Sequence, residues 1–211
     1  MPKIIVLDKD DRWNRSAEDE FLWWPRTLWI DPGVVSGVAV VWFDPKALLV
    51  DEKPTAKVVL AYSELFLRGP ENVQVKQFLQ LHDKLDEEVG LATGSESFVP
   101  RQLNMDKDFL SPARLRAVID YELWRKRNLS ASVGRDGGEG VPLYTQAPVD
   151  AMNAFTNDRL KALHMYTPGS EDHANDAKRH CLLHVRRLKG HGTDSLNMFK
   201  LMHGYEEGWF E

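Results

Sequence analysis

Cysteine is nearly absent from this chain of 211 residues, which contains only Cys181. A single thiol excludes an internal disulfide and any zinc site built from several cysteines, and it suits a reducing compartment. The sequence also lacks an apolar run of the roughly 18 residues that a membrane-spanning helix needs. Its first residues, acidic from Asp8 onward, do not have the pattern of a signal peptide. We therefore expect a cytoplasmic protein with no membrane partner.

An excess of basic charge is absent as well, because the net charge is −5. A negative sum disfavours nucleic acid as a partner, but the distribution of charge along the chain matters more than the sum. Residues 101–135 include eight basic and four acidic side chains, and residues 177–193 include five basic side chains and no acidic one. This segregation leaves room for one DNA-facing side.

The elements predicted from apolar periodicity alternate between strands and helices. Five apolar runs predict strands over 27–30, 37–43, 57–62, 91–100 and 141–146, the first two joined as an antiparallel hairpin. Helical spacing predicts helices over 71–89, 111–128, 147–163 with a break near Thr156, and 172–189. The third of these strands follows the hairpin after a polar link that contains Pro45 and Pro54. The fold class is therefore α/β, with a mixed five-stranded sheet, its first three strands antiparallel, flanked by helices.

Three regions follow from this order of elements. Residues 1–25 are expected to form an extension that docks through its aromatic end, residues 26–190 a single domain, and residues 191–211 a tail. Within the domain, residues 101–110 are expected to form a loop, after which Ser111 serves as N-cap and Pro112 as the first helical residue.

Two acidic residues lie in predicted strands. Asp31 ends the first strand, directly before Pro32 and Gly33 turn the chain. Burying an unpaired carboxylate costs several kcal/mol, so such an acid usually sits beside a cation, a metal or a cluster of donors. The alternative is that Asp31 only caps the turn. Glu96 shares a strand face with Phe98, and a salt bridge on an edge strand is the alternative interpretation for it.

The last predicted helix combines a stripe of small apolar residues with polar residues along its border. The stripe recurs at spacings of three and four, at Ala174, Ala177, Cys181, Val185 and Leu188. His173 and Asp176 project together from the first turn, and Asp172 is interpreted as the N-cap. His180 and His184 lie four residues apart and could hold a transition metal, but without further visible ligands we interpret them as border packing.

Three segments, TLWIDPGVVSGVAVV, SESFVP and HANDAKRH, together resemble RuvC-type Holliday junction resolvases of the ribonuclease H-like superfamily, especially phage-encoded relatives. The predicted order of elements also resembles that family. The resemblance implies four catalytic residues that are also metal ligands: Asp31, Glu96, His173 and Asp176. They would hold two Mg²⁺ ions, with Mn²⁺ as a substitute, because carboxylates from different elements can clamp two ions around a scissile phosphate. The products would carry a 5′-phosphate and a 3′-hydroxyl.

The resemblance also implies a substrate and an assembly. The protein would be a crossover junction endodeoxyribonuclease acting on branched DNA as a homodimer, in the host cytoplasm if phage-encoded. Candidate DNA contacts are Lys178, Arg179, Arg101 and Lys107, with a solvated helix face as the alternative for the first two. The family's junction-centre aromatic has no counterpart at the expected spacing, since Phe98 lies one residue nearer the acid and Phe109 is the substitute.

Other functions remain open at this stage. One is a less structure-selective flap or fork endonuclease of the same fold, and another is a module that binds branched DNA without cutting it. Sugar kinases and actin-like ATPases also begin with a strand-Asp-x-Gly turn, but they carry a second such turn, and Asp136-Gly137 follows a polar linker rather than a strand. Exposed tryptophans such as Trp23, Trp24 or Trp124 could serve a dimer interface.

Overall fold

A computed structural model describes residues 4–7, 24–49, 58–86, 90–98, 107–132, 143–169, 172–189, 199, 200 and 203. Its strands are β1 (Ile5–Val6), β2 (Arg26–Asp31), β3 (Ser36–Phe43), β4 (Val59–Leu67), β5 (Leu91–Glu96) and β6 (Tyr144–Gln146). Its helices are α2 (Pro45–Leu49), α4 (Glu71–Asp86), α5 (Lys107–Ser132), α6 (Pro148–Ala154), α7 (Asn157–Ala162) and α8 (His173–Leu188). No helix in these ranges is long and apolar enough to cross a membrane.

The strands form one mixed sheet in the order β1-β4-β3-β2-β5-β6. Strand β3 pairs antiparallel with both β2 and β4, whereas β5 is parallel to β2 and β6 is parallel to β5. The predicted α/β class, with a mixed sheet flanked by helices, is confirmed. The sixth strand is an addition, because Ile5 and Val6 pair with the edge of β4. At the aromatic end of the extension, Trp24 packs against the cluster beneath α4 and α5, and the other aromatic residues lie outside the described residues.

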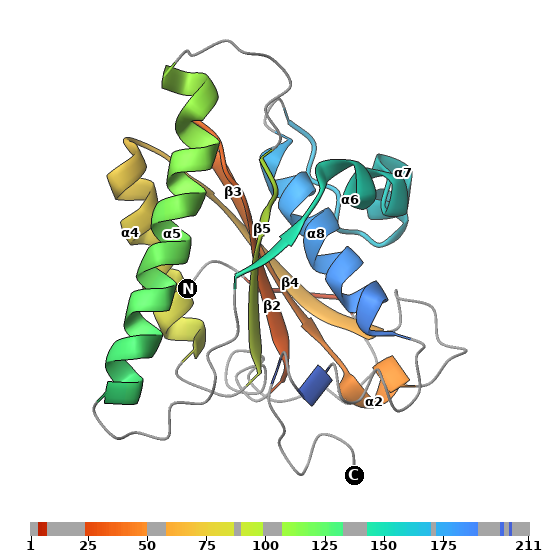
Figure 1. Cartoon of the computed structure of the whole chain (residues 1–211). Coiled ribbons are helices and arrows are strands. Elements are labelled where there is room, and N and C mark those ends of the chain that lie inside the picture. Colours follow the sequence, from red (N-terminus) through yellow and green to blue (C-terminus); the bar gives the residue numbers. More distant parts are fainter. Residues whose placement is uncertain are drawn as a thin grey trace.

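Helices cover both faces of the sheet, with α4 and α5 on one side and α6, α7 and α8 on the other (Figure 1). Side chains of β2 alternate between the two layers, as a strand requires. Leu28 and Ile30 join the cluster beneath α4 and α5, whereas Trp29 joins the cluster beneath α8. The domain therefore has two apolar layers, and α8 forms much of the second.

The start of α5 differs from the prediction. The helix begins at Lys107, so Ser111 and Pro112 lie inside it rather than at its N-terminus. The first four N–H groups of a helix have no intrahelical partner. A proline at the sixth position therefore removes only one hydrogen bond near the helix end, and the preceding turn remains helical. The predicted break near Thr156 is confirmed, since Thr156 is the N-cap of α7 and its hydroxyl accepts from Arg159 N.

Two buried histidines join the end of α8 to the C-terminal part of the chain. His184 Nε2 lies 3.0 Å from His203 Nε2, and His203 Nδ1 donates to the Gly90 carbonyl at 2.8 Å. Because His203 uses its Nδ1 proton for Gly90, its Nε2 accepts and His184 Nε2 donates. Burial lowers the pKa of His203 to about 4 and that of His184 well below its usual value. Both rings are therefore neutral, and part of the predicted tail belongs to the core.

Because both histidines are buried and neutral, we expect the folded protein to lose stability in mild acid. Between pH 6.5 and about pH 4 the unfolded chain binds a proton at His203 that the folded chain does not. The free energy of unfolding therefore falls as the pH drops through this window, by roughly 3 kcal/mol from His203. The raised pKa of Asp31 acts in the opposite direction. The contribution of His203 is therefore isolated by comparing the free energies of urea unfolding of the wild type and of His203→Phe at several pH values, because Asp31 is the same in both proteins. The variant should lose stability less steeply in acid, and parallel profiles would contradict the assignment.

Candidate active site

The turn that follows Asp31 is held by buried polar contacts. Ser36 Oγ donates to Gln74 Oε1 at 2.6 Å and accepts from Gly33 N at 3.2 Å. Gln74 Nε2 in turn donates to the carbonyl oxygens of Val34, at 2.8 Å, and Gly69, at 2.9 Å. The turn between β2 and β3 is thereby fixed to α4, which sets the position of the carboxylate at the end of β2.

The N-terminus of α8 rests directly on β3. A Cβ atom at Gly37 would lie 2.1 Å from the carbonyl carbon of His173 and 2.3 Å from Ala174 N. Only a residue without a side chain permits this approach. The close contact brings the His173 ring beside Gly33, and so beside the end of β2.

Asp31 and His173 form a short hydrogen bond at this position. His173 Nδ1 donates to Asp31 Oδ2 at 2.6 Å, where the aspartate is buried and the imidazole is partly exposed. Burial raises the pKa of Asp31 to about 6, although the His173 bond opposes the rise. The same bond raises the pKa of His173. The partner of the Asp31 carboxylate is therefore His173, and the interpretation that Asp31 only caps the turn is wrong.

Glu96 lies next to Asp31 because their strands are parallel neighbours. Ile30 pairs with Ser95, so the two acids end β2 and β5 side by side. Strand β5 lies between β2 and β6, so the edge-strand interpretation of Glu96 is wrong. Its Oε2 lies 3.2 Å from His180 Nε2, a residue that we had assigned to border packing. The spacing of seven between His173 and His180, which places both on one helix face, was the signal for this contact.

Asp176 lies one turn after His173 on α8 and is tied to Arg179. The Arg179 Nη1 group donates to Asp176 Oδ1, while Nε donates to the carbonyl of Phe155 at 3.0 Å. Burial raises the pKa of Asp176, and the neighbouring Arg179 opposes this rise. Negative charge on Glu96 raises the pKa of both Asp31 and Asp176. The three carboxylates therefore act on one another electrostatically.

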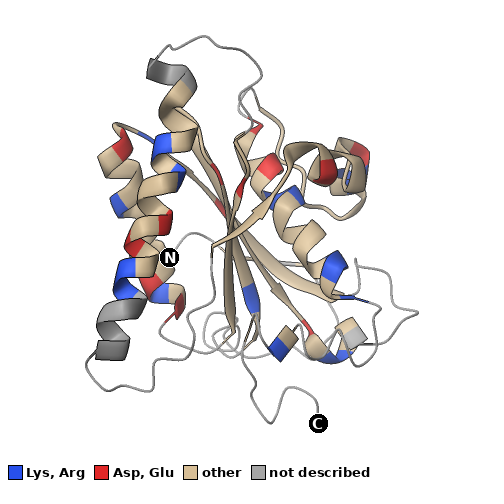
Figure 2. Ribbon diagram, viewed as in Figure 1, with Lys and Arg blue, Asp and Glu red and all other residues tan. Residues whose placement is uncertain are grey.

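All four predicted site residues line one cavity of about 630 Å³. Its polar wall is formed by Asp31, Glu96, His173, Asp176 and His180, and its other walls are largely apolar, with Phe98, Pro112, Val149 and Met152 among them. Figure 2 shows acidic residues at the end of the sheet where β5 ends and α8 begins. Each carboxylate has a partner on α8: His173 for Asp31, His180 for Glu96 and Arg179 for Asp176. Helix α8 thus organises the site.

Two predicted DNA contacts are corrected by their burial. Lys178 is 0% exposed and its Nζ donates to Glu64 Oε2 at 2.6 Å and to Thr167 Oγ1 at 3.0 Å. Arg179 is only 5% exposed and serves Asp176. Neither is a solvated helix residue, and Lys178 faces β4 rather than solvent. Arg101 and the Lys107 side chain lie outside the described residues.

Much of the basic charge that suggested a DNA-facing side is paired with nearby acids. On α5, Arg114 Nη2 lies 2.5 Å from Glu71 Oε1 and Lys126 Nζ lies 2.5 Å from Asp83 Oδ1, both acids belonging to α4. At the end of α8, Arg187 Nη2 lies 3.0 Å from Asp150 Oδ2. The excess of basic residues in these two segments therefore overstates the positive charge that they present on the described surface.

The buried Lys178 should contribute to stability through its ion pair. Lys178→Ala leaves Glu64 without its cation, and we expect a loss of about 3 kcal/mol in the free energy of unfolding measured in urea. Lys178→Met combined with Glu64→Gln removes both charges while keeping most of the packing volume, and should recover most of that loss. Equal stability of Lys178→Ala and the wild type would contradict a structural role for the pair.

The donor set of the cavity fits a hard divalent cation. Three carboxylates and one imidazole offer oxygen and nitrogen ligands. The repulsion among the negatively charged carboxylates is relieved when a cation binds between them. Among the residues that the structure describes, no three of these groups are already converged as ligands. Asp31 is bonded to His173 and Asp176 to Arg179, so a cation would have to take over contacts that these partners make.

Comparison with known proteins adds no assignment, since no family model matches the chain and no curated protein matches it significantly.

Proposed function

We propose that the protein is a metal-dependent endonuclease of the ribonuclease H-like type that cuts branched DNA, with Holliday junctions as substrate. One observation carries the proposal: acids from β2, β5 and α8, far apart in sequence, meet in a single cavity. The mixed sheet, with β2 at its centre and α8 packed on one face, supports the resemblance drawn from the sequence.

The residues of the site have separable roles in this proposal. Asp31, Glu96 and Asp176 would hold two Mg²⁺ or Mn²⁺ ions, with His173 as a further ligand or as a group that orients the attacking water. Bound ions would activate water and stabilise the charge on the leaving oxygen. Arg179 keeps the Asp176 carboxylate in place. The apolar wall of the cavity, including the exposed Val149 and Met152, offers a surface for the sugar and base next to the scissile phosphate.

Cleavage of defined DNA substrates tests the proposal. The protein is incubated with a labelled four-way junction, a flap and a matched linear duplex, each with Mg²⁺, Mn²⁺ or EDTA. Paired symmetric nicks in the junction that require a divalent ion are expected. Equal cutting of flap and duplex would retain the nuclease and replace its junction preference with the less selective activity. Binding of junctions without cleavage in any ion would contradict the assignment of the acids as catalytic.

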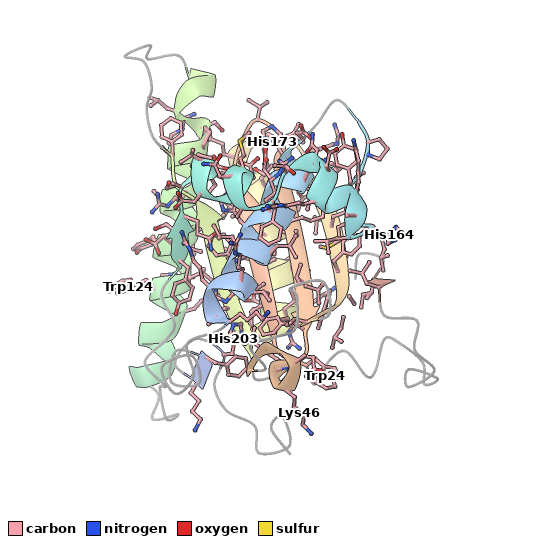
Figure 3. All side chains as sticks on the ribbon, turned by 90° about the vertical axis from the view of Figure 1, so that its right-hand side faces the viewer. Trp24, Lys46, Trp124, His164, His173 and His203 are labelled. Carbon is pink, nitrogen blue, oxygen red and sulfur yellow. The ribbon has the colours of Figure 1, made fainter. Side chains whose placement is uncertain are left out.

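A homodimer is part of the proposal, because a junction presents two symmetric strands to cut. Tyr121 and Trp124 stack on each other on α5 with ring centroids 6.0 Å apart, and both are more than half exposed. Figure 3 shows Trp124 well away from His173, so such a contact would leave the cavity open. Sedimentation of the wild type and of Trp124→Ser tests this surface. A dimer that is weakened by the substitution is expected, and an unchanged mass would exclude this face.

A further inference from the structure

His180 is buried between two polar side chains at the edge of the cavity. It is 1% exposed, and its two ring nitrogens both have partners. Nε2 lies 3.2 Å from Glu96 Oε2, and Nδ1 lies 3.0 Å from Gln146 Oε1. Glu96 and Gln146 are paired residues on the parallel strands β5 and β6. The imidazole of His180 therefore bridges two side chains, those of Glu96 and Gln146, whose backbones are fixed side by side in the sheet.

The direction of the hydrogen bond to Glu96 follows from the chemistry of the partners. An ionised carboxylate can only accept, so Nε2 of His180 must carry a proton. The amide of Gln146 can present either its oxygen or its nitrogen to Nδ1, and it adapts to either state of that atom. In both arrangements His180 donates to Glu96. The contact thus does not depend on whether the ring is neutral or charged.

The ring itself is held in place by β2. Trp29 stacks on His180 with ring centroids 5.4 Å apart and an interplanar angle of 12°. Trp29 is positioned in turn by Gly94, where a Cβ atom would lie 2.5 Å from the indole, and by a 2.8 Å bond from its Nε1 to Thr27 Oγ1. A fixed ring can hold one oxygen of Glu96 in a defined orientation.

We propose that His180 is a positioning residue for Glu96. It engages Oε2 of the carboxylate and leaves Oε1 for a divalent cation, so that the ligand is oriented before the ion arrives. This inference rests on the proposed function, because it assumes that Glu96 is a metal ligand. Partners that orient ligating side chains typically contribute 10-fold to 100-fold in metal affinity or activity.

Binding of Mn²⁺ to the full-length protein, followed by electron paramagnetic resonance of the free ion, tests the proposal without an activity assay. His180→Phe keeps the volume of the ring and its stacking on Trp29 but removes the donor, and we expect about 10-fold to 100-fold weaker binding. His180→Gln retains a donor within reach of Glu96 and should recover most of the affinity. In the cleavage assay, His180→Phe should lower kcat while leaving KM for the junction nearly unchanged.

His184→Phe is the matched control. His184 is buried on the same helix one turn later and also contacts Trp29, with ring centroids 6.1 Å apart. Its polar partner, however, is His203, and Figure 3 shows that His203 and His173 lie at opposite ends of the sheet. The control should lose stability without losing Mn²⁺ affinity. If His180→Phe does not fold, His180→Asn, which is too short to reach Glu96, replaces it with the same expectation.

The possible results separate the two proposals. If the wild type binds Mn²⁺ and His180→Phe binds it with the same affinity, the positioning role is overturned and the proposed function stands. The same conclusion follows if His184→Phe loses as much Mn²⁺ affinity as His180→Phe. A wild-type protein that binds no Mn²⁺ would overturn the proposed function, and the inference with it.

Discussion

Replacing Asp31 by Asn is expected to reduce cleavage of branched DNA about 1,000-fold, or about 4 kcal/mol in transition-state stabilisation. The substitution removes a carboxylate that ends the central strand of the site and leaves an amide, which is a poor ligand for Mg²⁺. The amide oxygen can still accept from His173 Nδ1. At neutral pH the variant also removes a buried carboxylate whose pKa is raised to about 6. We therefore expect its free energy of unfolding to be no lower than that of the wild type.

The control for this variant is the same chemical change at an exposed position. Asp158 on α7 is 92% exposed in its side chain and lies 3.4 Å from Lys161 Nζ, outside the cavity lining. Asp158→Asn should cleave at the wild-type rate. Initial rates under single-turnover conditions, with thermal unfolding of each protein, make the comparison. Cleavage by Asp31→Asn within a few fold of the wild type would remove Asp31 from the chemistry.

Substituting Gly37 by Ala should cause the largest loss of stability from a single added methyl group. The new Cβ would lie 2.1 Å from the His173 carbonyl carbon and 2.2 Å from its oxygen. Backbone atoms cannot move aside as a flexible side chain would, so the N-terminus of α8 must lift from β3. Overpacking of this kind costs about 3 kcal/mol or more. Because α8 carries His173 and Asp176, cleavage should fall with stability.

Gly169→Ala serves as its control, because a Cβ at Gly169 would meet no atom within 4 Å. The free energy of unfolding of this variant should lie within about 0.5 kcal/mol of the wild-type value. Urea unfolding at constant pH measures both proteins. Equal stability of Gly37→Ala and Gly169→Ala would show that α8 does not pack on β3 as closely as described.

Local sequence patterns placed single site residues on their elements, whereas only the family resemblance brought the four residues together. An apolar run ending in Asp-Pro-Gly marks the end of a strand by itself, and helical periodicity placed His173 and Asp176 on one turn. That Glu96 lies beside Asp31 depends on parallel strand register, which no local pattern specifies. The contact between α8 and Gly37 likewise depends on a close backbone approach that a glycine permits but does not reveal.

The ion pair of Lys178 shows why the charge pattern misled. Its partner, Glu64, is 114 residues away on β4. The predicted third strand ended at residue 62, because Ser63 and Glu64 interrupt the apolar run, whereas β4 continues to Leu67. Glu64 thus lay outside the predicted strand, and Lys178, which neutralises it, was predicted to contact DNA or solvent. A run of basic residues on a helix does not itself distinguish solvated side chains from buried, paired ones.

The number of Mn²⁺ ions bound by the wild type, determined by electron paramagnetic resonance titration, tests the central claim most directly. The claim is that Asp31, Glu96 and Asp176 form one site in this cavity that holds two divalent ions. It predicts two saturable ions per chain in the wild type, competed by Mg²⁺, and none in Asp31→Asn/Glu96→Gln/Asp176→Asn. Circular dichroism should show that the triple variant is folded. Saturable binding that survives in the folded triple variant, or no binding by the wild type, would contradict the claim.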